Sequence, residues 1–324
     1  MRPTRRGVAV LVIAIVALLI SSRFGQPGLT AVAGPLFVAV FAAAMQVLWS
    51  GKPRVERDRL GRGFPGETRS VELRVDGSGI ATMTDTLSEG LDGETTVRRS
   101  LPATVTYQIR YTDRGEQHAG PVEATVTDAL GLVREEYTIS DRTEVLVYPP
   151  VYRLGGSEAF ARTFTPTSED RQSFDRLREY VSGDSLRDVH WKSSAKREDL
   201  LVKEFADTRN DRGLLVAAEA REGNADEMAA AAATVAMAAL ESGLAVELAV
   251  PNSTVERGYG DTHRTRLLEL LARASAGRTD QIDDADVAIT ANGDGVTVSV
   301  DGRRQSFADV TASRDNPIAG EVNG

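Results

Sequence analysis

The chain has 324 residues, a length that favours two domains, and 41% hydrophobic with 26% charged residues is a folded composition. It contains no cysteine, which excludes disulfides, thiol catalysis and cysteine-ligated metal sites. Its net charge of −9 argues against general nucleic-acid binding, which depends on a basic surface. The three histidines, His118, His190 and His263, are too far apart in sequence to form a local metal motif.

The basic residues are almost all arginine, with 34 Arg and 4 Lys. An acidic, lysine-poor chain is typical of proteins from salt-loving organisms, where surface carboxylates help to keep a protein soluble. A genome rich in G and C also exchanges lysine for arginine, and this explanation stays open. We favour the first interpretation and expect a halophilic archaeal source.

Two apolar runs open the chain, residues 8–22 and 29–49, joined by a short polar link. The second is as long as a bilayer span, which needs about 20 residues, and the first reaches that length with its flanks. The first run also resembles the apolar part of a signal peptide, but no small-residue cleavage site precedes the link. We therefore predict two transmembrane helices within residues 1–51.

The basic residues near these runs predict their orientation. Residues 1–59 carry 8 basic and 2 acidic residues, a net +6, whereas the other 265 carry 30 basic and 45 acidic residues, a net −15. Only Arg23 lies between the two spans, and Trp49 is placed as an interfacial anchor. The positive-inside rule predicts a cell-membrane protein with two spans, and with both termini and the soluble domains in the cytoplasm. The flanking basic residues are Arg2, Arg5, Arg6, Lys52, Arg54, Arg57 and Arg59.

Residues 52–150 alternate apolar and polar side chains, which predicts strands with one buried face. The clearest segments are residues 71–75, 105–111, 122–126 and 144–148. Turn signals such as Asp76-Gly77 separate them, and the helix signal is poor. We predict a small β-sandwich that serves as a spacer or packing domain, with ligand sensing at the membrane as a weaker alternative.

Residues 151–212 form a predicted connector and an unusual segment, and residues 213–324 alternate strand and helix patterns. Asn224 is a candidate N-cap, and Gly243 is a stop signal. Strand–helix–strand repetition predicts a parallel sheet covered by helices. Strands are expected at 213–218, 244–250, 285–290 and 295–300, and helices at 225–242 and 262–275.

The segment 174–205 stands out because it holds three of the four lysines, Lys192, Lys196 and Lys203, in a chain that otherwise uses arginine. Lysine and arginine differ in shape and hydration, so this choice suggests that the ammonium group itself is needed. The second tryptophan of the chain, Trp191, lies there too. Residues 178–204 contain six basic and six acidic residues, which indicates an internally paired cluster rather than a basic patch.

This segment resembles the signature of domain-of-unknown-function family 58. A second stretch, Asp128 to Leu132, resembles the family's Asp-Pro-Phe-Gly-Leu segment with two substitutions. The signature continues into Leu201-Val202-Lys203-Glu204. We take its residues as a candidate partner-binding site: Arg178, Tyr180, Gly183, Asp184, Arg187, His190, Trp191, Lys192, Ser194, Lys196 and Lys203.

The resemblance implies a multidomain layout: a transmembrane α-hairpin, a β-sandwich, the signature, and an α/β von Willebrand A-like (Rossmann-like) domain. It also implies association with MoxR-type AAA+ ATPases, which are thought to assemble or activate partner complexes. The expected function is therefore a membrane-anchored cytoplasmic adaptor or scaffold, with that ATPase, other membrane proteins and the lipid bilayer as partners. No nucleic acid is expected.

A von Willebrand A domain with a metal site carries Asp-x-Ser-x-Ser after its first strand, oxygens that suit a divalent cation. Here residues 219–223 read Glu-Ala-Arg-Glu-Gly, with no hydroxyl and with Arg221 where a cation would lie. We therefore predict that the domain lacks a metal site, and we expect no cofactor.

An enzyme is the alternative. His190 could act as a general base, with Ser193 or Ser194 as nucleophile and Asp184 or Asp188 as partner. Asp188 and His190 are two residues apart, a spacing that does not share a helix face, and the G-x-S-x-G elbow of hydrolases is absent from the sequence. No G-x-x-x-x-G-K-[ST] loop occurs either, so the chain is not itself a P-loop ATPase. We assign no catalytic residue and keep a hydrolase using His190 as the second hypothesis.

Overall fold

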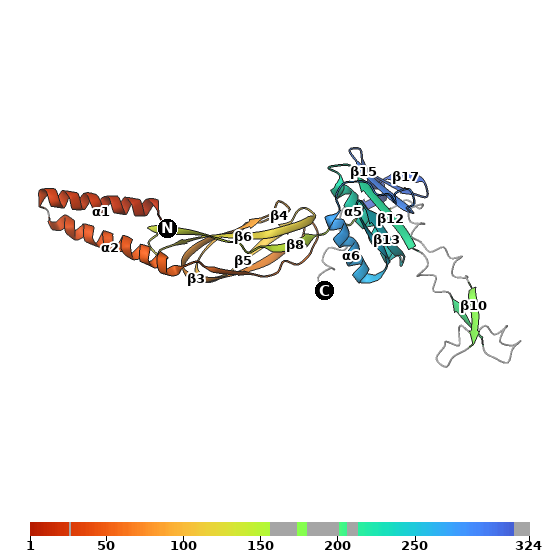
Figure 1. The fold of residues 1–324 in the computed structure, drawn as a ribbon, viewed down its shortest axis with the longest axis horizontal. Helices are drawn as coiled ribbons and strands as arrows, with labels where there is room; N and C mark the ends of the chain where they lie inside the picture. Colours follow the sequence, from red (N-terminus) through yellow and green to blue (C-terminus); the bar gives the residue numbers. More distant parts are fainter. Residues whose placement is uncertain (26, 156–173, 180–200, 206–212, 314–324) are drawn as a thin grey trace. The chain divides into compact units, whose positions relative to one another are not determined.

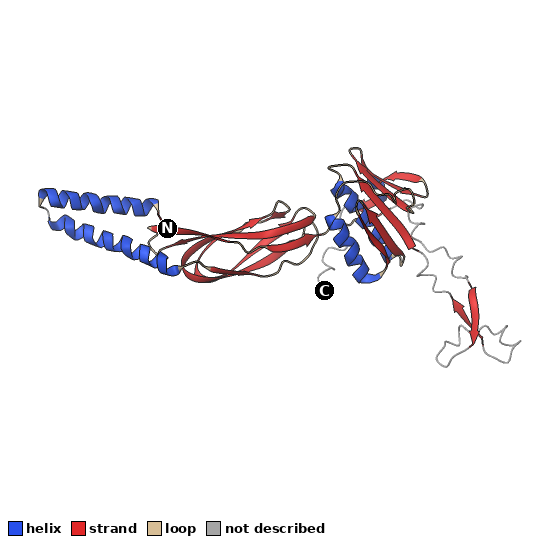
Figure 2. Ribbon diagram, viewed as in Figure 1, coloured by secondary structure: helices blue, strands red, loops and turns tan. Residues whose placement is uncertain are grey.

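The computed structural model describes residues 1–25, 27–155, 174–179, 201–205 and 213–313. Two compact units divide the chain, the first formed by Met1–Val147 and the second beginning at Tyr148 (Figure 1). Figure 2 shows helices and a strand-rich domain in the first unit, and a mixed arrangement of helices and strands in the second.

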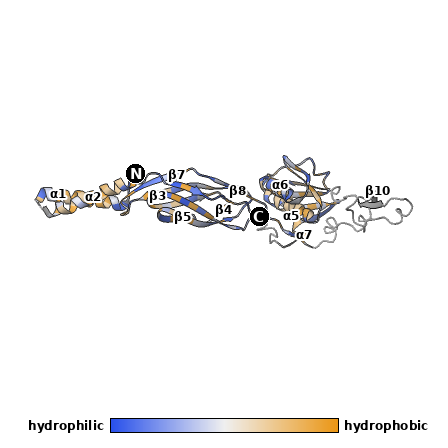
Figure 3. Cartoon of the chain, turned by 90° about the horizontal axis from the view of Figure 1, so that it is seen from below, coloured by the Kyte–Doolittle hydropathy of each residue, from blue (hydrophilic) through white to orange (hydrophobic). Residues whose placement is uncertain are grey.

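The first unit begins with a two-residue strand, β1 (Arg2–Pro3), and two long helices, α1 (Arg5–Phe24) and α2 (Pro27–Ser50). Both helices are long and apolar enough to cross a membrane, and apolar colours run along them in Figure 3. Only 22% and 17% of their apolar windows are buried, whereas a core helix of a soluble protein is mostly buried. The prediction of two apolar helices is confirmed.

Eight strands of the first unit form one antiparallel sheet, ordered β1-β7-β6-β3-β5-β4, with β2 paired to β3 and β8 paired to β6. The sequence predicted a sandwich, but hydrogen bonds join all the strands into one curled sheet. The longest strand has 20 residues, and its pairing register shifts between Val75 and Gly79, where Gly77 and Gly79 adopt positive φ. Such an irregularity bends a strand. The long strands therefore curl and continue through one sheet, whereas a sandwich would divide them between two sheets. The strands are β2 (Arg54–Arg57), β3 (Thr68–Leu87), β4 (Leu91–Asp92), β5 (Thr96–Tyr111), β6 (Gly115–Thr127), β7 (Val133–Ile139) and β8 (Thr143–Val147).

The period-two pattern explains the core of this sheet. Alternate residues of β3 and β5 point to the same side, and Val71 pairs with Tyr107 across the two strands. The inward residues include Leu73, Val75 and Ile109, all nearly inaccessible to solvent. The prediction of one buried face for the segments 71–75 and 105–111 is confirmed, because alternation places every second side chain in the core.

The second unit is built around a six-stranded sheet, ordered β14-β13-β12-β15-β16-β17. Within the described residues of this unit, three helices accompany it, α5 (Ala225–Glu241), α6 (Gly260–Arg273) and α7 (Phe307–Val310). A short pair of strands, β9 (Arg153–Leu154) and β18 (Thr311–Ser313), lies outside this sheet. The strands of the sheet are β12 (Gly213–Ala220), β13 (Ala245–Val250), β14 (Ser253–Gly258), β15 (Val287–Asn292), β16 (Gly295–Val300) and β17 (Arg303–Ser306).

The prediction of a parallel sheet holds only at its centre. β12 is parallel to both β13 and β15, but β14, β16 and β17 run antiparallel to their neighbours. Short connections explain the difference: Asn252 and Gly295 adopt positive φ in the turns before β14 and at the start of β16. A tight turn can join only antiparallel strands, whereas a parallel pair needs a long crossover. The sequence analysis missed β14 and β17.

Helix α5 packs against β12, β13 and β15. Eleven of its 17 residues are buried, most of them alanines, which allow a helix to approach a sheet closely. Asn224 precedes the helix as predicted, but its side chain makes no capping hydrogen bond and instead lies 3.4 Å from the Glu227 carboxylate. The capping mechanism predicted for Asn224 is therefore wrong, although the helix begins where expected.

Candidate functional site

The structure describes only part of the signature segment. β10 (Phe174–Glu179) and β11 (Leu201–Phe205) form an antiparallel pair, which confirms the strand predicted at 200–205. Arg178 pairs with Val202 and Leu177 with Lys203, so the backbone brings Arg178 and Lys203 to adjacent positions of this ladder. The other proposed site residues lie outside the described residues: Tyr180, Gly183, Asp184, Arg187, His190, Trp191, Lys192, Ser194 and Lys196.

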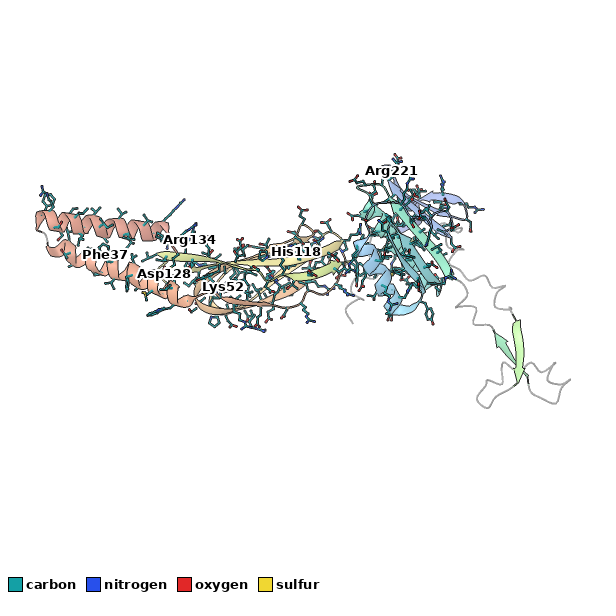
Figure 4. All side chains as sticks on the ribbon, viewed as in Figure 1. Phe37, Lys52, His118, Asp128, Arg134 and Arg221 are labelled. Carbon is teal, nitrogen blue, oxygen red and sulfur yellow. The ribbon has the colours of Figure 1, made fainter. Side chains whose placement is uncertain are left out.

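A well-defined junction joins the two helices of the first unit to its sheet. It is the turn between β6 and β7 together with the first residue of β7, residues 128–133, and Figure 4 labels Asp128 at the end of the sheet that meets the helices. Asp128 is 1% exposed. Its carboxylate accepts hydrogen bonds from the backbone N–H groups of Leu130, Leu132 and Val133 at 2.7–2.8 Å. The buried charge is thus fully used in shaping the turn.

The start of α1 is built onto this turn. The Thr4 N–H donates to the Leu132 carbonyl at 2.9 Å, and the Thr4 hydroxyl donates to the Gly131 carbonyl at 2.6 Å. The same hydroxyl accepts from the Gly7 N–H at 3.1 Å, which caps the helix. A β-carbon at Gly7 would overlap the carbonyl of Leu132. Strand β1 adds a ladder, in which Arg2 pairs with Arg134.

Helix α2 contacts the same turn. Ala129 N–H donates to the Gln46 side chain at 3.3 Å. Leu132 and Val133 of the turn form an apolar cluster with Ala43 and Val47 of α2. Both helices are therefore anchored to one turn by hydrogen bonds and by apolar packing. The family resemblance singled out Asp128–Leu132, but no sequence signal indicated which elements it would contact.

A second polar cluster lies inside the curled sheet. Arg57 donates to both carboxylate oxygens of Asp85, at 2.7 and 3.1 Å, and both side chains are inaccessible to solvent. Arg57 also donates to the Ala119 carbonyl and to the Thr143 hydroxyl. The Tyr107 hydroxyl donates to Asp85, and burial, followed by that hydrogen bond, raises the pKa of Tyr107 far above its usual value.

This cluster is saturated with internal partners and gives Tyr107 a higher pKa, the opposite of what a nucleophile requires. It therefore shapes the interior of the sheet. The cluster was not predicted from the sequence, although β3 contains one signal for it. Asp85 follows Ala81 and Met83 at the inward positions of β3, and an acid in an inward series needs a buried partner.

The sheet of the second unit has two contrasting faces. Val216, Ile289 and Val298 lie on one face and are buried. On the other face, Glu219 pairs with Thr290 in the ladder, and these residues line a hollow of about 630 Å³. Other residues of the hollow include Asp283, Asp286, Asn292, Thr297, Ser299, Asp301 and Arg304. This hollow is polar and acidic, which suits it to hydrogen bonding with a polar partner.

The end of β12 is where a von Willebrand A domain would begin its metal motif. Glu219 lines the hollow, and the Arg221 backbone N–H donates to the Ala291 carbonyl at 2.9 Å. Arg221 is exposed, and Figure 4 labels it in the second unit. Within the described part of the chain, no three His, Asp or Glu side chains gather as a metal site would require. The absence of a metal site remains a prediction.

Comparisons with known proteins agree with the resemblance at the level of the family. Residues 176–297 match the family described as "Protein of unknown function DUF58". The chain is also 26% identical over 218 residues to "Uncharacterized protein YeaD" of Bacillus subtilis (strain 168). That alignment covers 61% of this chain and 55% of the relative, so the chain matches about half the length of the curated relative. The chain is therefore similar to the DUF58 family over the matched residues.

Solved structures match only parts of the chain. "WR4, a C.elegans MSP family member" is 9% identical, with a TM-score of 0.23, and the match covers 29% of this chain and 96% of that one. The E. coli chaperone DraB is 11% identical, with a TM-score of 0.22, covering 31% of this chain and 57% of that one. Scores this low carry no argument about fold or function.

Proposed function

We propose that this chain is a membrane-anchored scaffold or adaptor that works with a MoxR-type AAA+ ATPase on the cytoplasmic side. One observation carries the anchoring: two exposed apolar helices are built onto the turn formed by residues 128–133. A signal peptide is removed, but removing α1 would also remove β1 and the Thr4 contacts from the folded sheet. The spans are therefore better understood as permanent parts of the first unit.

The described residues favour a binding protein over an enzyme. The buried Arg57–Asp85–Tyr107 cluster is saturated, and the polar hollow beside Glu219 has the character of a contact surface. The basic residues that flank the spans, including Arg5, Arg6 and Lys52, support the cytoplasmic orientation. The ATPase is proposed as a partner because of the family resemblance of the signature segment. We propose this segment as the site where the ATPase docks.

We further propose that the second unit is von Willebrand A-like. Numbered from β12, its strands follow the order 3-2-1-4-5-6, the order of a doubly wound nucleotide-binding sheet. The parallel centre and the helix between β12 and β13 support this assignment. The antiparallel β14, β16 and β17 are departures from an all-parallel sheet. In such folds, partners bind beyond the carboxyl ends of the strands, where Arg221 lies here.

The test is co-purification of the full, C-terminally tagged chain from native membranes, with salt kept high because the acidic composition predicts a salt-dependent fold. Wild type is compared with Trp191→Ala and Lys192→Arg. Lys52→Arg is the matched control, since it makes the same exchange at a lysine outside the signature. We expect an AAA+ ATPase with wild type and with the control, and its loss from the folded signature variants. An ATPase absent from every sample would contradict the proposal.

The hydrolase hypothesis predicts a different result. His190→Ala would then leave the ATPase bound but abolish complementation of a strain that lacks the gene. The scaffold proposal expects normal complementation by His190→Ala whenever the variant is folded and binds the ATPase. Circular dichroism of each purified variant separates a loss of contact from a loss of fold.

A further inference from the structure

The turn between β6 and β7 presents one exposed apolar side chain beside the membrane helices. Leu130 is 60% exposed, although the residues that follow it, Leu132 and Val133, are buried against α2. The turn reads Asp-Ala-Leu-Gly-Leu-Val, and its one charge, on Asp128, is satisfied by three backbone N–H groups. Its exposed part is thus apolar and carries no charge of its own.

The contacts of the turn with α2 fix its depth. Ala129 bonds to Gln46, which lies four residues, or about 6 Å of helix, before the end of α2 at Ser50. A helix of 24 residues is about 36 Å long, against a hydrocarbon thickness of about 30 Å. A centred α2 therefore extends about 3 Å beyond the hydrocarbon at each end. Gln46, and with it Ala129, then lies slightly inside that boundary.

The contacts with α1 give the same level independently. The Leu132 carbonyl lies against Gly7, immediately after Arg5 and Arg6 and at the start of the apolar run. Trp49, 79% exposed near the end of α2, is a residue type enriched at the membrane interface. Gln46 lies three residues deeper than Trp49. Both helices therefore place the turn where the basic flank ends and the apolar span begins.

We propose that the turn is a third membrane-contacting element of this chain, with the Leu130 side chain inserted into the interfacial region of the lipid bilayer. This inference rests on the proposed membrane anchoring and adds a contact that the two spans do not require. Moving the exposed leucine side chain out of water is favourable, and the Asp128 charge, already satisfied by backbone N–H groups, adds little opposing cost. With both helices joined to the turn, the sheet is held at a fixed level on the bilayer.

The absence of cysteine allows a direct test, because a single introduced cysteine can be labelled without removing others. Leu130→Cys carries an environment-sensitive fluorophore, and the full chain is reconstituted in vesicles of phosphatidylcholine and phosphatidylglycerol. Lipids with a spin label near the headgroup or deep in the chains act as quenchers. Val38→Cys, exposed within α2, reports the span, and Asp113→Cys, exposed in the turn at the opposite end of β6, reports water.

We expect the label at Leu130 to be quenched most strongly by the shallow spin label, the label at Val38 by the deep one, and the label at Asp113 by neither. Quenching at Val38 with none at Leu130 overturns this inference but leaves the anchoring intact. No quenching at Val38 overturns the anchoring as well. A blue-shifted emission at Leu130 that lipid quenchers do not affect indicates a protein surface as the occupant and also overturns the proposal.

Discussion

The two sheets of this chain bury polar groups in opposite ways. In the first unit, Arg57, Asp85 and Tyr107 meet inside the curled sheet, where each finds its partner among the strands. In the second unit, the buried face is apolar and the polar residues, such as Glu219 and Thr290, gather on the other face around a hollow. The comparison shows that the first sheet pairs its charges inside, whereas the second places its polar side chains on the face that carries the hollow.

The largest expected effect on stability comes from breaking the buried Arg57–Asp85 ion pair. Replacing Asp85→Ala removes the buried partner of the Arg57 guanidinium and leaves only the half-exposed Asp141 carboxylate at 3.9 Å, which should lower the free energy of unfolding by about 3–5 kcal/mol. Denaturant unfolding followed by circular dichroism measures the loss, and amide hydrogen exchange in β3 and β6 assigns it to the first unit.

The matched control is Arg74→Ala. It breaks a pair with Glu72 on the same strand, but both partners are more than a third exposed. Exposed pairs contribute about 0–1 kcal/mol, so the change should be several-fold smaller. Equal losses of unfolding free energy in the two variants would contradict the view that burial determines how much an ion pair contributes to stability. Replacing both Arg57→Met and Asp85→Leu should recover part of the stability, because the unpaired charge is then gone.

The next effect concerns the junction. Asp128→Ala removes the acceptor of three backbone N–H groups in a turn that is closed to water. Hydrogen bonds to charged groups contribute about 1.5–3 kcal/mol each and are not additive, so we expect a loss of roughly 3 kcal/mol. Faster amide exchange at Leu132 and Val133 would locate it. Asp113→Ala is the control, since that exposed carboxylate accepts only from its neighbour Thr112 in the described structure.

A smaller effect is the dependence of the first unit's stability on pH, which we expect from a buried tyrosine of its sheet. Burial raises the pKa of Tyr111 from 10.0 to about 12. A proton held more tightly in the folded state contributes stability below pH 10, and this contribution is lost as the pH rises through 10 towards 12. Unfolding at pH 9 and pH 12 should therefore differ more for wild type than for Tyr111→Phe. Equal differences in the two proteins would show that Tyr111 is not the group responsible.

Much of the fold could be predicted, because its local patterns are strong. The two apolar runs, the alternation around Val71–Val75 and the alanine-rich helix after Asn224 each follow from one period or one composition. The antiparallel direction of β14 and β16 could not be deduced, since it depends on which short connections close into turns such as those at Asn252 and Gly295. The curl of the first sheet likewise depends on a local irregularity of β3.

The sites were harder to predict for a different reason. Arg57 and Asp85 are 28 residues apart, and Thr4 and Gly131 are 127 residues apart, so only the fold brings them together. An acidic residue at an inward position, such as Asp85, predicts that a buried basic partner exists. The sequence does not identify which of the many arginines is that partner. The signature segment was recognisable from its lysines and its family resemblance, and the pairing of β10 with β11 adds the register of Arg178 and Lys203.

The smallest effect compares the starts of two helices. Thr4 caps α1 through its hydroxyl, so Thr4→Ala should cost about 0.5–2 kcal/mol in the first unit. Asn224 occupies the same position before α5 but makes no capping bond, so Asn224→Ala should change stability by less than about 0.5 kcal/mol. Helix α5 is held by its buried alanines against the sheet, whereas the start of α1 is held by its cap and the turn beneath it. If Asn224→Ala proved as costly as Thr4→Ala, the side chain of Asn224 would have to cap α5 in solution, as its residue type predicts.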